Sequence, residues 1–134
     1  MSHSATYAVG REKVREYAHA VGETDPLYLD PDAARAAGYA DVVAPPMFAA
    51  VYAFPAVMQA AVDPAVGMDL ARLVHGAQEF RWEELVVAGD EIVTECELTE
   101  RRETGGLQFF VFESRSANQR GETTCVGTWT NIVR

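Results

Sequence analysis

The sequence has neither a long apolar run nor a basic leader. No 18-residue apolar stretch is free of proline, so a membrane-spanning segment is not expected. The N-terminus MSHSATY lacks a basic region followed by an apolar one, which is the pattern of a secretory signal. We therefore expect a cytoplasmic protein with no membrane partner.

Cysteine and histidine are scarce. The two cysteines, Cys96 and Cys125, lie in separate β-like segments, which favours free buried thiols over a disulfide in a cytoplasmic chain. The three histidines are far apart, and the CxxC, HxxxH and HExxH spacings of metal sites do not occur. We expect no metal site and no cofactor.

Positive charge is also limited. The chain carries 20 acidic and 11 basic residues, for a net charge of −9. This balance repels phosphate backbones, and the basic residues form no stripe interleaved with aromatic residues. The charge pattern therefore argues against nucleic acid as a partner.

Apolar residues change their period along the chain. A chain of 134 residues suits one domain, 1–134, which buries about two-thirds of its unfolded surface. The segment 47–62 is apolar nearly all round, which is typical of a helix buried on every side, and Pro55 should kink or split it. The expected elements are a short strand at 7–9, helices at 10–22, 31–37 and 47–62, and strands forming an antiparallel meander at 73–83, 91–102, 107–118 and 122–133. This order predicts an α+β fold.

A polar loop precedes the apolar helix. The loop reads GETDPLY at 22–28, and Ala34 follows after five further residues. It resembles the signature of the MaoC-like dehydratase family, Gly-Asp-x-Asn-Pro-aliphatic-His followed by a small residue at this spacing. The strand LVHGAQEF at 73–80 is similar to a strand of the same family. The resemblance covers most of the chain and implies a hot dog fold, an antiparallel sheet wrapped around a long central helix.

The resemblance also shows where this chain departs from the family. Family members use the Asp and His to activate water in (R)-specific hydration of enoyl thioesters, or to remove a proton in the reverse dehydration. The matching positions here are Glu23 and Tyr28, and Asp25 replaces the Asn. A phenol is not a ready base at neutral pH, and Asp25 adds a second carboxylate. None of these three residues is expected to reproduce the family's catalytic pair.

The approach to the helix differs as well. Active family members have a His-Gly step whose glycine N–H binds the thioester carbonyl, whereas this chain reads Ala44-Pro45-Pro46-Met47. Proline has no N–H to donate, so a donor would have to come from Met47 or Phe48.

Three functions remain open. The segment AAGYADVVAPPMF is most similar to the non-catalytic, substrate-binding subunits of actinobacterial two-component (3R)-hydroxyacyl-ACP dehydratases. Such subunits work with an Asp/His-bearing hot dog partner. The alternatives are a homodimeric acyl-thioester-binding protein, and an independent hydratase or thioesterase that uses Glu23, Asp25 or His75. For His75, a hydrogen bond to Glu79 is favoured over a role as a base. The apolar face and sheet edges predict a dimer or larger assembly.

The expected ligand is an acyl-ACP or acyl-CoA thioester. The candidate substrate-binding residues lie along the start of the apolar helix: Pro46, Met47, Phe48 and Tyr52. Core packing is favoured for the side chains of Phe48, Tyr52 and Phe54. Acyl carrier proteins are acidic, so docking one would need a local basic patch. The candidates are the cluster Arg11, Lys13 and Arg15, the pair Arg101 and Arg102, or a partner subunit, although such groups are more often ordinary solvated surface.

Overall fold

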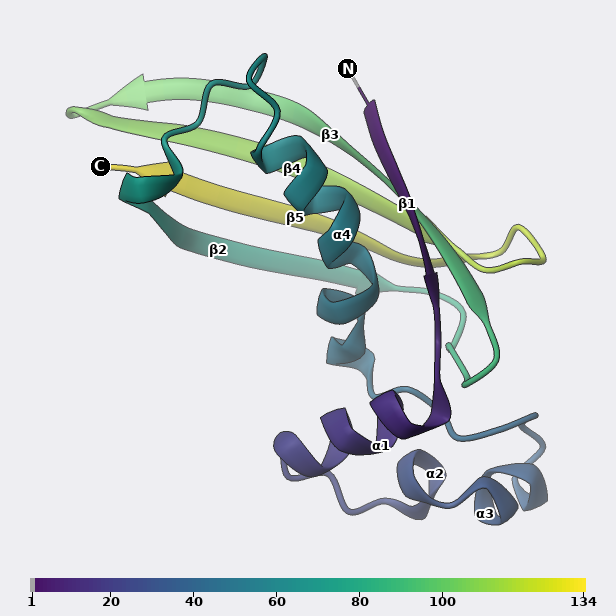
Figure 1. Ribbon diagram of the computed structural model, residues 1–134. Coiled ribbons are helices and arrows are strands. Elements are labelled where there is room, and N and C mark those ends of the chain that lie inside the picture. The colour runs from purple at the N-terminus through teal and green to yellow at the C-terminus, as the bar shows by residue number, and fades with distance from the viewer. Residues whose placement is uncertain (1) are drawn as a thin grey trace.

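A curved antiparallel sheet and one long helix make up most of the computed structural model, which describes residues 2–134 (Figure 1). The strands are β1 Ser2–Ala8, β2 Leu73–Trp82, β3 Glu91–Thr104, β4 Leu107–Ala117 and β5 Thr123–Val133. They form one five-stranded sheet in the order β1-β3-β4-β5-β2. Neighbouring strands are antiparallel throughout. The expected α+β layout is confirmed.

The helices form two groups (Figure 1). The first group lies together at one end of the molecule, away from the sheet, and consists of α1 Arg11–Ala20, α2 Pro26–Leu29 and α3 Pro31–Ala36. The second group is the 3₁₀ turn η1 Pro46–Phe48 and the long helix α4 Ala49–Ala61, which lies against the sheet. A short 3₁₀ turn, η2 Leu70–Arg72, leads into β2. No helix within residues 2–134 is long and apolar enough to cross a membrane.

The sheet order corrects the expected meander. Only β3, β4 and β5 are joined in sequence as neighbours, while β2 pairs with β5 and occupies an edge. The strand expected at 7–9 is instead the seven-residue β1, which pairs with β3 from Ser2 to Ala8. Short polar residues dominate its sequence SHSATYA, so its apolar alternation is weak. Strand β1 is longer than expected because it pairs with β3, and no local sequence pattern predicts that pairing.

Strand β4 lies in the middle of the sheet, as its apolar sequence predicts. Phe110 and Phe112 point into the core and are fully buried. Phe109 lies on the opposite face and is half-buried, with the Arg102 guanidinium 4.0 Å above its ring. The outer face of β4 is therefore covered in part by a long side chain of β3.

Helix α4 is not buried on every side. Its small residues Ala53, Ala56 and Ala60 face the sheet, and their size lets the helix approach closely. A stripe of larger residues lies on the other side, where four are exposed and Val51 is half-buried: Met47, Val51, Phe54, Met58 and Val62. We call this set the α4 stripe. One sheet covers only one side of a helix, which is why the expectation of full burial was wrong. Pro55 lies within a continuous helix and does not split it.

Both cysteines are free and buried. Burial raises the pKa of the Cys96 thiol to about 12 and that of the Cys125 thiol to about 11. Neither thiol is ionised at neutral pH, so both act as small apolar side chains. The expectation of free thiols is confirmed.

The core is anchored at the start of α4 by Phe48, which is 0 % exposed and makes edge contacts with Tyr7 and Tyr17. We expect Phe48→Ala to lower the free energy of unfolding by about 3–5 kcal/mol, because the site cannot collapse onto the missing ring. Urea denaturation measures this loss. Val93→Ala, on an exposed part of β3, is the control and should change stability by less than about 0.5 kcal/mol. Equal effects would contradict the placement of Phe48.

Candidate functional site

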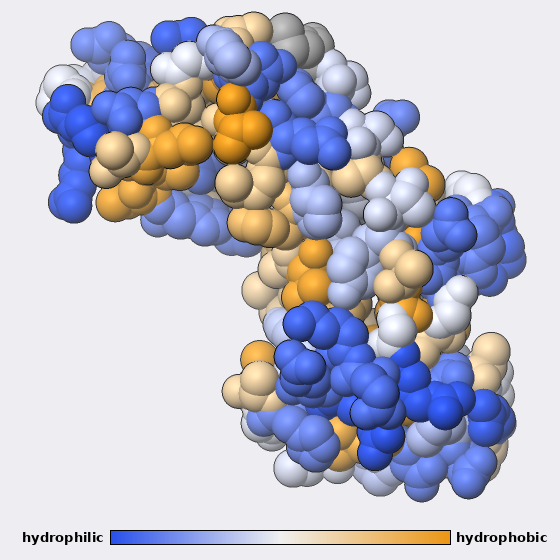
Figure 2. All heavy atoms as spheres, viewed as in Figure 1, coloured by the Kyte–Doolittle hydropathy of each residue, from blue (hydrophilic) through white to orange (hydrophobic). Residues whose placement is uncertain are grey.

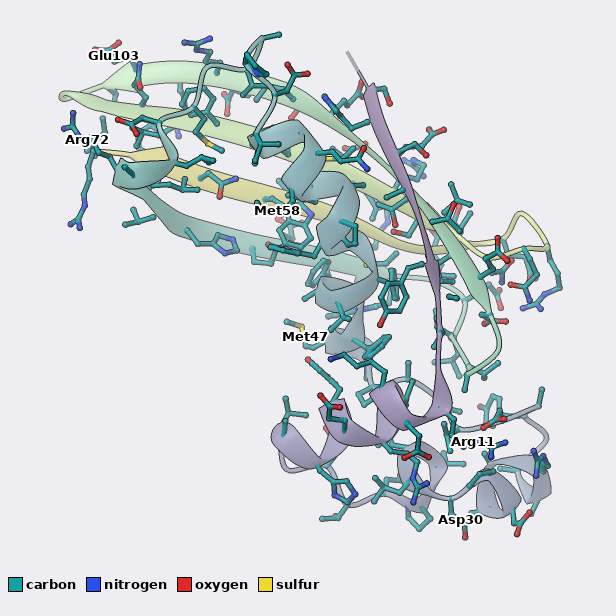
Figure 3. All side chains as sticks on the ribbon, viewed as in Figure 1. Arg11, Asp30, Met47, Met58, Arg72 and Glu103 are labelled. Atoms are coloured by element: carbon teal, nitrogen blue, oxygen red, sulfur yellow. The ribbon has the colours of Figure 1, made fainter. Side chains whose placement is uncertain are left out.

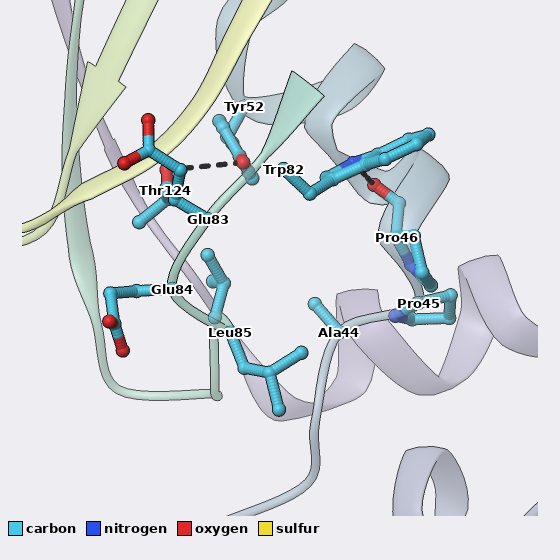
Figure 4. A pocket seen from close by; sticks show the side chains of 10 residues that line it. Ala44, Pro45, Pro46, Tyr52, Trp82, Glu83, Glu84, Leu85 and Thr124 are labelled. Atoms are coloured by element: carbon cyan, nitrogen blue, oxygen red, sulfur yellow. Dashed lines mark hydrogen bonds between the residues drawn. The ribbon is translucent and has the colours of Figure 1, made fainter. Parts of the chain in front are cut away.

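The approach to α4 separates two hollows, both of which Pro45 and Pro46 line. The first, which we call the groove, is lined by Tyr17, Val21, Glu23, Pro45, Pro46 and Met47 and has a volume of ≈ 780 Å³, including space open to solvent. The second, which we call the inner pocket, has a volume of ≈ 330 Å³ measured in the same way (Figure 4). Its lining residues are Ala44, Pro45, Pro46, Tyr52, Trp82, Glu83, Glu84, Leu85, Val86 and Thr124.

The loop before α2 is shaped by an aspartate cap. The Leu27 N–H donates to Asp25 Oδ1 at 2.9 Å, and Pro26 occupies the first helical position. Asp30 and Pro31 repeat this arrangement at the start of α3, where the Asp32 N–H donates to Asp30 Oδ1 at 2.9 Å. The sequence predicts α3 from this Asp-Pro pair, and the same signal at Asp25 was available for α2. Asp25 is exposed, and its carboxylate caps the backbone at the start of α2.

Glu23 reaches the groove, whereas Tyr28 lies on α2. Glu23 is half-buried among the groove's apolar walls. Tyr28 is also half-buried, and burial together with the nearby charges of Glu23 and Asp25 raises the pKa of its phenol above the usual value. Both effects disfavour the phenolate. Tyr28 therefore remains protonated at neutral pH and cannot take a proton from water.

The backbone at the start of α4 leaves one donor near the groove. Pro46 has no N–H, and the Phe48 N–H donates to the Pro45 carbonyl at 2.9 Å. The Ala49 N–H donates back to the same turn, to Pro46 O. The Met47 N–H lies at this helix end and has no hydrogen-bond acceptor among residues 2–134. It belongs to a residue that lines the groove with Glu23.

The four candidate substrate-binding residues occupy different places. Pro46 and Met47 line the groove, and Tyr52 lines the inner pocket. Phe48 lies in the core between Tyr7, Tyr17 and Tyr52. The side chain of Phe48 therefore packs against protein, as sequence reasoning favoured.

Two hydrogen bonds form the walls of the inner pocket (Figure 4). The Tyr52 hydroxyl bonds to Thr124 Oγ1 at 3.2 Å, and the Trp82 indole N–H donates to the Pro46 carbonyl at 2.7 Å. Burial raises the pKa of Tyr52 far above its usual value, so this hydroxyl stays protonated. No local sequence signal points to Trp82, because the partner of its indole lies 36 positions away.

His75 lies on β2 and does not bond to Glu79. Its Nε2 donates to the Ala77 carbonyl at 2.9 Å, and its ring stacks on Trp129 at a centroid distance of 6.3 Å. A bulge between His75 and Ala77 shifts the strand register. The expected pairing assumed uninterrupted alternation, which the bulge breaks.

The basic residues of α1 are engaged in ion pairs. Lys13 Nζ lies 3.3 Å from Glu16 and Arg15 Nη1 lies 2.8 Å from Glu12, both across one helical turn. Arg11 makes two hydrogen bonds to Asp41, at 3.0 and 2.8 Å. These pairs leave α1 close to neutral on its outer face, with no concentration of positive charge.

The Arg11–Asp41 pair ties α1 to the segment that leads to α4. The hydrogen bonds from Arg11 hold the pKa of the Asp41 carboxyl below its usual value, with a further contribution from the Val42 N–H. A lowered folded pKa means that the pair stabilises the fold above the unfolded pKa. That contribution is lost as the pH falls through the folded pKa.

We therefore expect Asp41→Asn to lower the melting temperature at pH 7, with the difference from wild type shrinking below about pH 4, where unfolded aspartate titrates. Asparagine keeps the acceptor for the Val42 N–H, so the variant isolates the charge. Thermal melts from pH 7 to pH 3 measure the effect. Asp32→Asn, at a largely exposed position, is the control and should melt like wild type at each pH. A constant gap for Asp41→Asn would contradict the ion-pair account.

Residues 1–126 match the model of the FAS1-like, dehydratase domain region family. A "UPF0336 protein" of Clavibacter michiganensis is 45% identical over 131 residues, covering 98% of this chain and 88% of that protein. Relatives of high identity thus extend over nearly the whole sequence.

Solved structures share the same architecture. The C-terminally truncated HadBC (3R-hydroxyacyl-ACP dehydratase) complex of Mycobacterium tuberculosis matches with a TM-score of 0.83 and 26% identity, covering 98% of this chain and 94% of that chain. The unliganded R-hydratase PhaJ1 of Pseudomonas aeruginosa matches with a TM-score of 0.79 and 18% identity, covering 99% and 79%. The second likeness shows the fold alone. Together they confirm the expected hot dog fold.

Proposed function

The chain belongs to the FAS1-like dehydratase domain region family, and on that premise we propose that it is the non-catalytic, acyl-binding subunit of a (3R)-hydroxyacyl-thioester dehydratase. In this proposal the chain holds an acyl-ACP or acyl-CoA thioester in its groove. A second hot dog subunit supplies the Asp and His that move protons between water and the substrate. Dehydration then occurs at a site that both subunits complete.

The protonation state of Tyr28 carries this proposal. Hydration of an enoyl thioester needs a base that removes a proton from the attacking water. The family's histidine position holds a phenol, and both its burial and the carboxylates Glu23 and Asp25 raise the phenol's pKa. The groove keeps apolar walls that suit an acyl chain, from Val21, Pro45 and Met47. An acyl-binding subunit needs apolar walls that hold the acyl chain, and it does not need a catalytic base of its own.

The α4 stripe supports the presence of a partner. Phe54 is 51 % exposed, and Met47, Met58 and Val62 are exposed beside it at helical spacing. Figure 2 shows apolar surface lining the hollow between the sheet and the helical segment, and Figure 3 shows Met47 and Met58 on that side of α4. A continuous exposed apolar stripe marks an interaction surface. The similar HadBC protein is a complex, which supports a second hot dog subunit here.

The proposal predicts no hydration by the chain alone and hydration by the pair. The test uses purified chain, a candidate Asp/His-bearing hot dog subunit, and both together, with loss of absorbance of a trans-2-enoyl-CoA as the readout. We expect the chain alone to fall at least about 100-fold below the pair, since a missing proton-transfer group costs that much. Activity of the chain alone at the level of the pair would overturn the non-catalytic assignment.

The stripe gives a separate test of association. Phe54→Asp should lower the affinity between subunits by at least about tenfold, because an unpaired charge would enter an apolar interface. Light scattering and analytical ultracentrifugation measure the assembly. Val93→Asp, at an exposed position on β3, is the matched control and should assemble normally. If both variants assemble like wild type, the α4 stripe is not the interface.

A second function is favoured by one observation. Glu23 and Met47 line the same groove, and the Met47 N–H has no acceptor among residues 2–134. A carboxylate and a backbone donor on residues that line one groove are two parts of a hydratase or thioesterase site. If the chain alone turns over an enoyl-CoA or acyl-CoA, Glu23→Gln must abolish that activity. Loss of activity in this variant would make Glu23 the catalytic residue.

A further inference from the structure

We propose that Trp82 is a positioning residue: its hydrogen bond to the Pro46 carbonyl orients the next peptide, so that the Met47 N–H points into the groove and binds the carbonyl of an acyl thioester. This inference rests on the proposed function, because it takes the ligand to be an acyl thioester. It adds the group that receives the thioester carbonyl and the distant side chain that aims this group.

The direction of the Met47 N–H depends on one backbone torsion. The ring of Pro46 fixes its φ, so ψ of Pro46 is the angle that turns the plane of the Pro46–Met47 peptide. No cis peptide bond occurs among residues 2–134, so the carbonyl and the N–H of this peptide point in opposite directions. Any group that holds the Pro46 carbonyl therefore also sets the direction of the Met47 N–H.

Two N–H groups hold the Pro46 carbonyl. The Ala49 N–H donates to it from within the turn, and the Trp82 indole N–H donates at 2.7 Å from the end of strand β2 (Figure 4). Neither η1 nor α4 has a side-chain cap, and the hydrogen bonds of a 3₁₀ turn have poor geometry. The bond from Trp82 therefore fixes a peptide that the turn alone would hold loosely.

The position of Trp82 shows which way the Met47 N–H points. Trp82 lines the inner pocket and not the groove, so the Pro46 carbonyl points toward the inner pocket. The Met47 N–H points in the opposite direction, and the N–H groups of a first helical turn point out of the helix end. Because Pro46 and Met47 both line the groove, this N–H is directed toward it.

A free N–H at this place suits the oxygen of a thioester carbonyl. The Met47 N–H has no acceptor among residues 2–134, and it lies at the positive end of the 13-residue helix α4. Hydrogen bonds to the Pro46 carbonyl polarise the shared peptide, which strengthens its N–H as a donor. The carboxylate of Glu23 in the same groove only accepts hydrogen bonds. The Tyr17 hydroxyl is a second donor in the groove, so the test must identify which donor binds.

The test compares butyryl-CoA with S-butyl-CoA, a thioether that lacks the carbonyl oxygen. Isothermal titration uses the full chain alone and with an Asp/His-bearing hot dog subunit. Wild type should bind butyryl-CoA about three- to tenfold more tightly than S-butyl-CoA, the effect of one hydrogen bond. In Trp82→Phe, which keeps a ring but has no donor, this preference should fall below about twofold, with the affinity for S-butyl-CoA unchanged.

The thioether separates positioning from a merely structural role. A change in the shape of the groove would weaken both ligands, whereas a misdirected N–H weakens only the ligand that has a carbonyl. Val93→Ala, on an exposed part of β3, is the control and should bind both ligands like wild type. Melting curves check that each variant is folded.

Two NMR signals report on the hydrogen bond itself. The chain has four methionines, so selective ¹⁵N-methionine labelling distinguishes the amide of Met47 from those of Met58 and Met68. Butyryl-CoA should move the Met47 amide proton downfield, and S-butyl-CoA should not. The carbonyl signal of [1-¹³C]butyryl-CoA should shift on binding to wild type and stay near its free position on binding to Trp82→Phe.

The outcomes separate this inference from the proposed function. Equal affinities of wild type for the two ligands, or a Met47 amide that butyryl-CoA does not move, would overturn Met47 as the donor. A preference that survives in Trp82→Phe, or equal weakening of both ligands, would overturn the positioning role of Trp82. Acyl binding would stand in each of these cases. Failure of wild type to bind butyryl-CoA under either condition would overturn acyl binding and this inference together.

Discussion

The structure depends on how α4 is covered. The helix is apolar on more of its circumference than one five-stranded sheet can reach. Alanines at 53, 56 and 60 let its inner side pack closely against the sheet, while Phe54, Met58 and their neighbours remain open on the other side. Large apolar side chains are stabilising only when buried. The inward side also buries Tyr52 and Val57, so large apolar side chains lie on both sides of the helix, which is the arrangement of a helix with a second surface to meet.

The same helix fixes where the groove and the inner pocket lie. Its first turn begins at two prolines, whose ring-locked backbone leaves few donors and sets a rigid wall between the groove and the inner pocket. This wall is held from three directions. The Val43 N–H donates to the Leu27 carbonyl at 2.8 Å and the Ala44 N–H to the Val86 carbonyl at 2.8 Å, while Trp82 holds Pro46. Both hollows thus depend on segments far apart in the sequence.

Local sequence signals predicted local structure well. Helix α1 and helix α3 follow from apolar spacing and from the Asp30-Pro31 cap, and all four long strands were located within about two residues at each end. Pairing and surface exposure were harder, because they depend on contacts between distant segments. The edge position of β2, the extent of β1 and the open side of α4 all belong to this second kind.

The candidate site also has features that the local sequence predicts and features that depend on distant contacts. The resemblance singles out Glu23, Tyr28 and Pro46 as residues that depart from the family's pattern, since each departure is visible in the residue itself. It treated Asp25 as a charge of the site, whereas the Leu27 N–H occupies its carboxylate. It also missed Trp82, whose role exists only through a carbonyl on another element. Motif reasoning identifies the groups that carry chemistry but not the groups that hold them in place.

The proposed function gives this chain an acyl groove without a base, and these two properties are physically separable. Proton transfer depends on one or two groups of suitable pKa, so a half-buried phenol in place of a histidine removes it at a single position. An acyl groove depends on many apolar atoms, here from Tyr17, Val21, Pro45 and Met47. Tyr17 packs against the core and Pro45 is buried, whereas Val21 and Met47 are exposed. Selection for folding therefore preserves the buried part of these walls even in a subunit without catalysis. A second subunit that supplies one base would restore the chemistry without any change to those walls.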